Sequence, residues 1–302
     1  MPEFDLDVLV IGGSGVDTIV RVPQLDMPLA DSHMVPMVQT RVGHTGDNVA
    51  LGCRALGLRT RLVDFLGNDA EGRMVREHHE DAGLLCGWAI GGITKRAANL
   101  VDPAGRRMSF YDTRTDADAR LPDELWLSHA GRSRHVHVSI THPSQFVLRG
   151  LPSGPSISTD LHNWDGLNQY HLEFAEAADI VFLSIAALPE YERSMRQILR
   201  GRAHVVVATA GADGCYLMTE DGPLRHFPAA PVFGEAVDSN GAGDAFVCGF
   251  LYGRLGGLSL EESVRLGSLA GAYACTIPAT ETRPLTLERL RDVSRETSPN
   301  AV

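Results

Sequence analysis

Short apolar segments alternate with helical patterns along most of the chain, and this alternation limits the possible folds more than any other feature. The helical patterns cover residues 47–56 and 72–82 and begin again near Pro189. The apolar segments lie at residues 8–11, 62–66, 136–138, 157–159, 180–183 and 205–208. Alternating strands and helices are typical of a parallel sheet with helices on both faces. We therefore expect an α/β protein in three layers around a central, mostly parallel sheet.

Two segments, about residues 18–42 and 97–115, lack helical periodicity and contain β-type residues and turn signals such as Asp102-Pro103-Ala104-Gly105. We expect them to form a small second sheet. Residues 215–227 predict a β-hairpin that turns at Asp221-Gly222. Because the 302 residues contain no repeat and no convincing linker, we expect a single domain over residues 1–302 with the small sheet attached to it.

Charge and composition exclude several classes of protein. The formal net charge of −11 argues against a nucleic-acid partner, because binding phosphates requires a basic face. No apolar run approaches the ~18 residues of a membrane span, so we expect no membrane partner. The five cysteines are scattered and form no Cys-x-x-Cys pair, which argues against a zinc site and favours reduced thiols in a cytoplasmic protein.

The chain contains one lysine, Lys95, although its arginines are numerous. A P-loop nucleotide-binding protein needs a lysine in Gly-x-x-x-x-Gly-Lys-Ser/Thr, and a protein kinase needs one on a Val-Ala-Ile-Lys strand. Lys95 follows Gly92-Ile93-Thr94 and matches neither pattern. If the chain binds ATP, it must therefore hold the phosphates without a lysine.

The most specific segment is Val237 to Phe246, which reads Val-Asp-Ser-Asn-Gly-Ala-Gly-Asp-Ala-Phe and leads into an apolar helix. Its small residues allow a tight turn, so that the N–H groups at the helix start can form an anion site without a lysine. Asp244 would lie in the first helical turn. It could act as a general base beside a phosphoryl-transfer site, or it could simply be an aspartate that the helix dipole favours.

The run from Asp238 to Asp244 resembles the C-terminal signature of ribokinase-like sugar kinases, the phosphofructokinase-B family. Other segments resemble further motifs of this family in the same order, namely residues 11–20, 43–58, 65–72, 209–214 and 270–272. The resemblance implies a ribokinase-like fold whose small sheet forms a lid over the sugar. It also implies an enzyme that transfers a phosphoryl group from ATP, with Mg²⁺, to an alcohol group of a small molecule.

The resemblance also implies roles for individual residues. Asp244 would deprotonate the acceptor hydroxyl beside an anion hole formed by Gly241, Ala242 and Gly243. The substrate-binding residues would be Asp17, Gly43, His44, Asp47, Asn48, Asp160 and His162, and the ATP site would include Thr209, Gly211, Gly214 and Ser268. Asp238 belongs to a loop that often carries a monovalent cation, so K⁺ would be an optional cofactor.

The acceptor end departs from the usual family pattern. Residues 43–48 read Gly-His-Thr-Gly-Asp-Asn where Gly-Gly-Lys-Gly-Ala-Asn is usual, and residues 160–164 read Asp-Leu-His-Asn-Trp where many members have Asp-x-Asn-x-Arg. Residues 184–187, Ser-Ile-Ala-Ala, replace the Asn-x-x-Glu that helps to order magnesium-bound water. An intact catalytic end with an altered acceptor end suggests an unusual substrate.

Residues 45–47, 95–96, 158–166 and 270–280 are similar to a narrower group, the acarbose kinases. This similarity implies transfer of phosphate from ATP to the hydroxymethyl (7-) hydroxyl of the cyclitol ring of acarbose, which gives acarbose 7-phosphate and ADP. Acidic residues at Asp17, Asp47 and Asp160 would suit the protonated amine of acarbose. The alternatives are a kinase for another monosaccharide or a nucleoside, and a non-catalytic sugar-binding protein of the same fold. The chain would be a monomer or a homodimer.

Four histidines lie in or near these motifs. His135 and His137 alternate on a predicted strand, which favours packing over substrate contact because at most one of two alternating faces can meet a pocket. His162 follows a strand end, where ligands bind in open α/β sheets, so substrate contact and a structural role both remain open. His44 has no apolar neighbours on either side, which favours a functional role.

Overall fold

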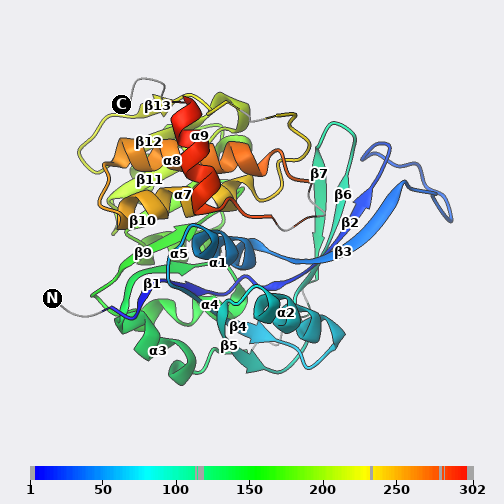
Figure 1. Cartoon of the computed structure of the whole chain (residues 1–302), viewed down its shortest axis with the longest axis horizontal. Helices are drawn as coiled ribbons and strands as arrows, with labels where there is room; N and C mark the ends of the chain where they lie inside the picture. Colours follow the sequence, from blue (N-terminus) through cyan, green and yellow to red (C-terminus); the bar gives the residue numbers. More distant parts are fainter. Residues whose placement is uncertain are drawn as a thin grey trace.

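A computed structural model of the chain describes residues 4–112, 114, 119–231, 234–278, 281 and 283–297. In this part of the chain, the strands form a nine-stranded sheet and a separate four-stranded sheet. Helices cover both faces of the larger sheet, and the smaller sheet extends from one side of the molecule (Figure 1). The predicted α/β architecture with a small second sheet is confirmed.

The large sheet is mostly parallel. Its strands are β1 (Leu6–Ile11), β4 (Thr60–Leu66), β5 (Leu85–Ile90), β8 (Ser133–Val138), β9 (Ser156–Asp160), β10 (Ile180–Ser184), β11 (Val205–Thr209), β12 (Cys215–Thr219) and β13 (Arg225–Phe227). They lie in the order β13-β12-β11-β10-β9-β8-β1-β4-β5. Every pair from β11 to β5 is parallel, whereas β12 and β13 form the predicted antiparallel hairpin at one edge.

Helices occur where the periodicity predicts them, with ends shifted by one to a few residues. The helices are α1 (Thr45–Ala55), α2 (Ala70–Asp81), α3 (Asp123–Gly131), α4 (His142–Gln145), α5 (Gln169–Ala177), α6 (Tyr191–Ile198), α7 (Ala242–Leu255), α8 (Leu260–Ala274) and α9 (Leu287–Thr297), with 3₁₀ turns at Leu148–Gly150, Ile185–Ala187 and Gly211–Asp213. Ser259 and Glu262 form a capping box at the start of α8. No helix in the described residues is long and apolar enough to span a membrane.

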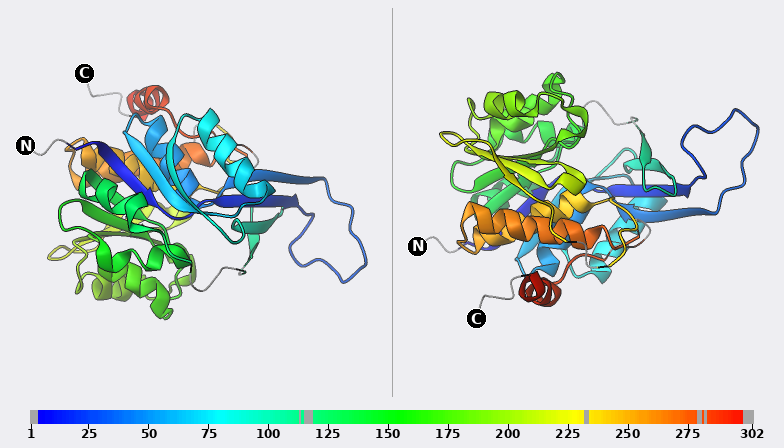
Figure 2. Two further views of the ribbon diagram at one scale, coloured as in Figure 1. Left: turned by 90° about the horizontal axis from the view of Figure 1, so that it is seen from below. Right: turned by 90° about the horizontal axis from the view of Figure 1, so that it is seen from above.

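The large sheet separates two hydrophobic cores. Side chains alternate between the faces of a strand, so Val8 and Val10 of β1 pack with α1, α7, α8 and α9, whereas Leu9 and Ile11 pack with α3, α5 and α6. Figure 2 shows the same three layers edge on, with the sheet between the two groups of helices. All five cysteines are free, and none is fully exposed.

The small sheet consists of β2 (Gly15–Arg21), β3 (Met37–Gly43), β6 (Arg96–Val101) and β7 (Arg107–Tyr111), in the order β3-β2-β6-β7. The predicted segments 18–42 and 97–115 contain these strands, but the β-structure begins earlier, at Gly15. Residues 113 and 115 of the second predicted segment lie outside the described residues. Figure 2 shows β2 and β3 extending away from the large sheet, with the connection between them at the far end.

Two connections, β1 to β2 and β5 to β6, lead from the large sheet to the small sheet, and one aspartate holds both. Gly12 and Gly13 have φ angles of 83°, which L side chains rarely adopt, and they turn the chain from β1 into β2. The carboxylate of Asp64, on β4, accepts a hydrogen bond from the backbone N–H of Ser14 at 2.7 Å. It also binds Nζ of Lys95, at the connection from β5 to β6, at 2.8 and 2.9 Å. The lone lysine therefore has a structural partner between the sheets.

Candidate active site

Asp244 lies where α7 begins and α1 passes beside it. Thr45 Oγ1 donates to Asp244 Oδ1 and Asn48 Nδ2 donates to Oδ2, each at 2.7 Å. Burial raises the pKa of Asp244, while the charge of His162 and these two hydrogen bonds oppose the rise. The result is a carboxylate with a fixed orientation and a greater affinity for a proton than an ordinary aspartate has.

The segment before Asp244 forms the start of α7. Gly241 is the N-cap and has a left-handed φ of 78°, a conformation that favours glycine. The N–H of Ala242 donates to Ser239 O at 3.2 Å. Because the first turn of a helix leaves N–H groups without intrahelical acceptors, Gly243 and Asp244 can present theirs to an anion. This geometry is compatible with the predicted anion hole.

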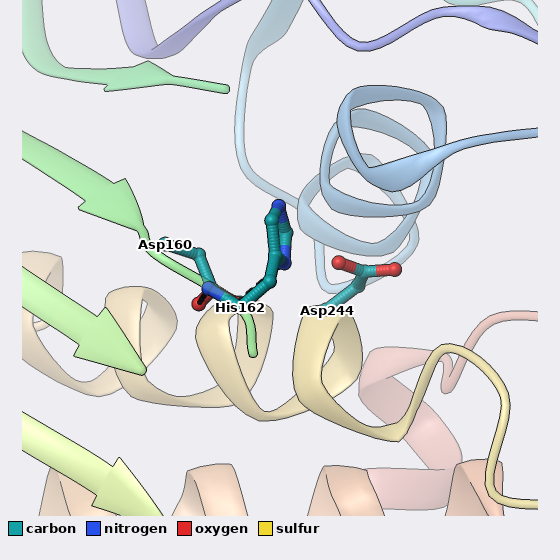
Figure 3. Close-up of side chains that lie close together, drawn as sticks. All are labelled: Asp160, His162 and Asp244. Atoms are coloured by element: carbon teal, nitrogen blue, oxygen red, sulfur yellow. Dashed lines mark hydrogen bonds and ion pairs between the residues drawn. The ribbon is translucent and has the colours of Figure 1, made fainter. Parts of the chain in front are cut away.

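Asp160 and His162 approach Asp244 from the end of β9 (Figure 3). Asp160 is the last residue of the strand, and its Oδ1 accepts the backbone N–H of His162 at 2.8 Å. His162 has a φ of 51°, and such strained non-glycine residues cluster at functional sites. Ligand atoms of Asp160, His162 and Asp244 lie within 4.8 Å of one another. Two carboxylates at this spacing fit Mg²⁺, which takes oxygen ligands and is usually bound by one or two carboxylates together with phosphate oxygens.

Asp17, Gly43 and His44 lie together where the small sheet meets α1. His44 Nε2 is 3.4 Å from Asp17 Oδ1, and Arg41 Nη2 is 3.5 Å from Asp17 Oδ2. A Cβ on Gly43 would lie 2.5 Å from Asp17 Oδ2, so a side chain there would require this carboxylate to move. His44, the N-cap of α1, has a φ of 80°. The charge of Asp17 is thus already balanced by Arg41.

Asp47 does not face the group around Asp244, and its expected role needs correction. Its side chain is 1% exposed. Its carboxylate accepts hydrogen bonds from Ser14 Oγ at 2.5 Å and Gly15 N at 3.0 Å, and pairs with His79 Nε2 of α2 at 2.9 Å. Burial raises the pKa of Asp47, and pairing with this carboxylate raises the pKa of His79. Asp47 therefore supports the connection from β1 to β2 instead of contacting substrate.

The four predicted ATP residues have different environments. Thr209 is the last residue of β11. Gly211, two residues later, has a φ of 58° and is exposed, with open space beside it. Ser268 lies half-buried on α8. Gly214 is glycine for a structural reason, because a Cβ there would lie 2.1 Å from Phe227 O of the hairpin. Thr209 and Gly211 lie at the carboxyl edge of the sheet, as Asp160 does, and their role in ATP binding stays a prediction.

Asp238 lies in the loop before α7 and is 6% exposed. Its Oδ1 accepts the N–H of Asn240 at 2.9 Å, and its Oδ2 accepts Arg21 Nη2 of the small sheet at 2.9 Å. The loop is also tied to the end of α8, because the N–H groups of Val237 and Asp238 donate to Cys275 O. Asp238, which was predicted to belong to a loop that carries a monovalent cation, thus forms an ion pair with Arg21.

His135 and His137 are buried in β8 and hydrogen-bonded to serines of β9. His135 contacts Ser156 Oγ and Ser158 Oγ at 2.6 and 2.7 Å, and His137 contacts Ser158 Oγ at 2.8 Å. Burial lowers the pKa of His135 to about 4 and that of His137 to about 3. Both side chains are neutral packing residues at neutral pH, and both contact Ser158 because residues two apart on a strand share a face.

The structure adds residues that the sequence reasoning did not select. Thr45 could have been found, because it lies within the unusual segment 43–48 and its hydroxyl is a hydrogen-bond donor. No sequence pattern marks Arg41 and Arg21 as site residues. Arg41 pairs with Asp17 on another strand, and Arg21 pairs with Asp238, which is distant in the sequence. Such charge pairs follow from the pairing of the strands, which a single sequence does not reveal.

Comparisons with known proteins identify the family. A family model described as pfkB family carbohydrate kinase matches residues 160–286. Acarbose 7(IV)-phosphotransferase of Actinoplanes sp. is 50% identical over 279 residues, covering 91% of this chain and 93% of the relative. A nucleoside kinase of Methanothermobacter thermautotrophicus is 28% identical over 92% of each chain.

Solved structures of carbohydrate kinases share the fold of this chain. The microbiome-derived acarbose kinase Mak1 superposes with a TM-score of 0.89 at 42% identity, covering 95% of this chain and 98% of that one. Ribokinase from Thermotoga maritima, at 21% identity, shares the fold with a TM-score of 0.79. The fold, the position of Asp244 and the half-identical relative lead to one conclusion: the chain belongs to the pfkB family of carbohydrate kinases.

Proposed function

We propose that this kinase transfers the γ-phosphoryl group of ATP to the hydroxymethyl hydroxyl of the cyclitol ring of acarbose and produces acarbose 7-phosphate and ADP. The observation that carries the proposal is the Asp244 carboxylate, held by Thr45 and Asn48 at the N-terminal turn of α7. The acceptor is suggested by the relatives, since both the half-identical enzyme and Mak1 are named for acarbose.

Asp244 would act as the general base. Its hydrogen bonds leave the carboxylate in one orientation, and its raised pKa makes it a stronger base than an exposed aspartate. As the acceptor oxygen attacks the γ-phosphorus, Asp244 takes the hydroxyl proton. The new O–P bond forms, the bond from the γ-phosphorus to the bridging oxygen breaks, and ADP leaves with the electron pair.

The start of α7 would stabilise the transferred group. Phosphoryl transfer depends mainly on positioning and on stabilising charge at the equatorial oxygens. The N–H groups of Gly241, Gly243 and Asp244 and the positive end of the helix dipole would supply this without a lysine, whereas the N–H of Ala242 is bound to Ser239 O. Mg²⁺, when bound with ATP, would neutralise phosphate charge, and Asp160 and Asp244 lie where it could be held.

Asp160 is the acceptor-side carboxylate best suited to a cationic substrate. Asp17 is paired with Arg41, and Asp47 is turned toward Ser14 and His79. Asp160 instead has no arginine or lysine partner in the described residues, and its charged neighbours are His162, at 3.5 Å, and the Asp244 carboxylate. A charge-assisted hydrogen bond between a substrate ammonium group and a partly desolvated carboxylate contributes ~1.5–3 kcal/mol to the free energy of binding.

The direct test is phosphorylation of a panel of acceptors. The protein is incubated with ATP and Mg²⁺ and with acarbose, ribose, fructose or adenosine, and each product is examined by mass spectrometry. We expect acarbose to gain one phosphoryl group, with ³¹P coupling to the two hydroxymethyl protons. Preferred phosphorylation of ribose, fructose or adenosine would overturn the assignment of acarbose as substrate but not the assignment of kinase activity. The absence of product with every acceptor would favour a non-catalytic binding protein.

A further inference from the structure

Two arginines of the small sheet contact the loop that leads into the anion hole. Arg21, at the end of β2, pairs with Asp238 at 2.9 Å. Arg107, at the start of β7, donates a short hydrogen bond to Asn240 Oδ1. Asp238 and Asn240 immediately precede Gly241, the N-cap of α7. The small sheet therefore holds the loop on which the anion hole depends.

The side-chain oxygens of this loop do not fit a monovalent cation, which the family resemblance leads one to expect here. A hard cation requires oxygen ligands. Asp238 Oδ2 already binds a guanidinium, Oδ1 binds the N–H of Asn240, and Asn240 Oδ1 binds Arg107. Asn240 Nδ2 is a buried donor without a partner in the described residues and cannot coordinate a cation, which leaves the exposed Ser239 as the only other side-chain oxygen of residues 238–240.

The charges lead to the same conclusion. The side chain of Asp238 is 3% exposed and that of Arg21 is 25% exposed, so the pair is largely shielded from water. A buried carboxylate needs a positive partner, and Arg21 provides one. A second cation on the same carboxylate would lie close to the guanidinium and be repelled by it. Asp238 therefore has no need of a cation from solution.

We propose that the Arg21 guanidinium takes the place of the monovalent cation, holds the Asp238 loop and thereby the anion hole, and makes the kinase independent of K⁺. Arg21 is a positioning residue, because it acts through Asp238 and Gly241 and does not touch the reacting atoms. Its place on β2 also couples the small sheet to the anion hole. The inference rests on the proposed kinase activity, and its test includes a measurement that needs no turnover.

The kinetic experiment compares acarbose phosphorylation in KCl and in tetramethylammonium chloride at equal ionic strength. The variants are Arg21→Ala and Arg21→Lys. Arg106→Ala is the control, because Arg106 lies in the turn between β6 and β7 of the small sheet and is also paired with one aspartate, Asp102. We expect the wild type and the control to be equally active in both salts.

We expect Arg21→Ala to lose kcat about tenfold without K⁺, equivalent to ~1.4 kcal/mol, with little change in KM for acarbose. K⁺ should restore much of this loss because Asp238 is then available to it, and Arg21→Lys should retain most activity without K⁺. Activation of the wild type by K⁺ to a similar degree would overturn the proposal. Arg21→Ala with wild-type kcat in both salts would also overturn it.

The second experiment measures the melting temperature in KCl or TlCl relative to tetramethylammonium chloride. K⁺ and Tl⁺ should raise the melting temperature of Arg21→Ala and leave the wild type unchanged, and the reverse pattern would overturn the proposal. If Arg21→Ala does not fold, Arg21→Gln replaces it, because glutamine keeps a donor and removes the charge. This measurement remains decisive if no acarbose is phosphorylated, which would refute the proposed function alone.

Discussion

Asp160 and Asp47 are both acidic residues near the predicted acceptor region, yet their surroundings differ. Asp160 ends β9 beside Asp244, whereas Asp47 is enclosed by Ser14, Gly15 and His79. The sequence placed both in one region, because residue type and motif position do not reveal which way a side chain points. Only Asp160 is therefore expected to distinguish a cationic acceptor from a neutral one.

The prediction is that Asp160→Asn lowers kcat/KM for acarbose by more than it lowers that for a neutral sugar. The loss should be about ten- to a hundred-fold, since a charge-assisted hydrogen bond is worth ~1.5–3 kcal/mol. Asp47→Asn, the matched control, should affect both acceptors equally and destabilise the fold. Equal losses for both acceptors with Asp160→Asn, accompanied by a higher Mg²⁺ requirement, would limit Asp160 to holding Mg²⁺ and would contradict its role in recognising a cationic acceptor.

At the scale of single elements, the sequence predicted most strands and helices because their periodicity is local. The helix starting near Asp47 and the hairpin over residues 215–227 needed no tertiary information. The start of the small sheet at Gly15 was missed, because the turn from the strand at residues 8–11 into the next strand depends on Asp64 and Asp47. Such long-range hydrogen bonds leave no periodic signal.

Strand β8 gives a prediction for the pH dependence of stability. Burial lowers the pKa of His135 to about 4 and that of His137 to about 3, from 6.5 in an exposed histidine. The unfolded chain thus binds protons first as the pH falls below 6.5. Above pH 6.5 these two histidines do not reduce the free energy of unfolding. As the pH falls from 6.5 toward their pKa values in the folded protein, the free energy of unfolding decreases progressively.

His137→Asn should reduce this pH dependence. Each histidine can add up to ~1.4 kcal/mol per pH unit to the slope, so the variant should lose less free energy of unfolding between pH 6 and 4 than the wild type loses. Urea unfolding at a series of pH values gives both slopes. Identical slopes would show that His137 is protonated equally in the folded and unfolded chain.

At the scale of the whole molecule, the sequence indicated a parallel sheet and a separate small sheet, and both are present. The strand order was not predictable, because every buried strand is similarly apolar and pairing depends on long-range contacts. The charge pairs between the sheets were equally hidden. Lys95 was noted only as the sole lysine, but the structure places it against Asp64, where the two connections from the large sheet to the small sheet meet.

This arrangement predicts a strong effect from Lys95→Met. Asp64 is 0% exposed, so removing the ammonium leaves a buried carboxylate with the Ser14 N–H as its remaining partner in the described residues. Such a loss typically costs ~3–5 kcal/mol, which urea unfolding would detect. The double variant Asp64→Asn with Lys95→Met should recover part of this loss, because no buried charge then remains. A cost for Lys95→Met below ~1 kcal/mol, as in surface ion pairs, would contradict the structural role.

The central claim is that Asp244 is the base in a kinase that phosphorylates acarbose, and one measurement tests it most directly. Initial rates of acarbose 7-phosphate formation are compared for the wild type and Asp244→Asn, with nucleotide binding and melting temperature measured as controls for folding. We expect the wild type to form the monophosphate and the variant to lose ~10²–10⁴-fold in turnover with nucleotide binding retained. A folded variant that keeps more than about a tenth of wild-type turnover, or a wild type that forms no acarbose phosphate, would contradict the account.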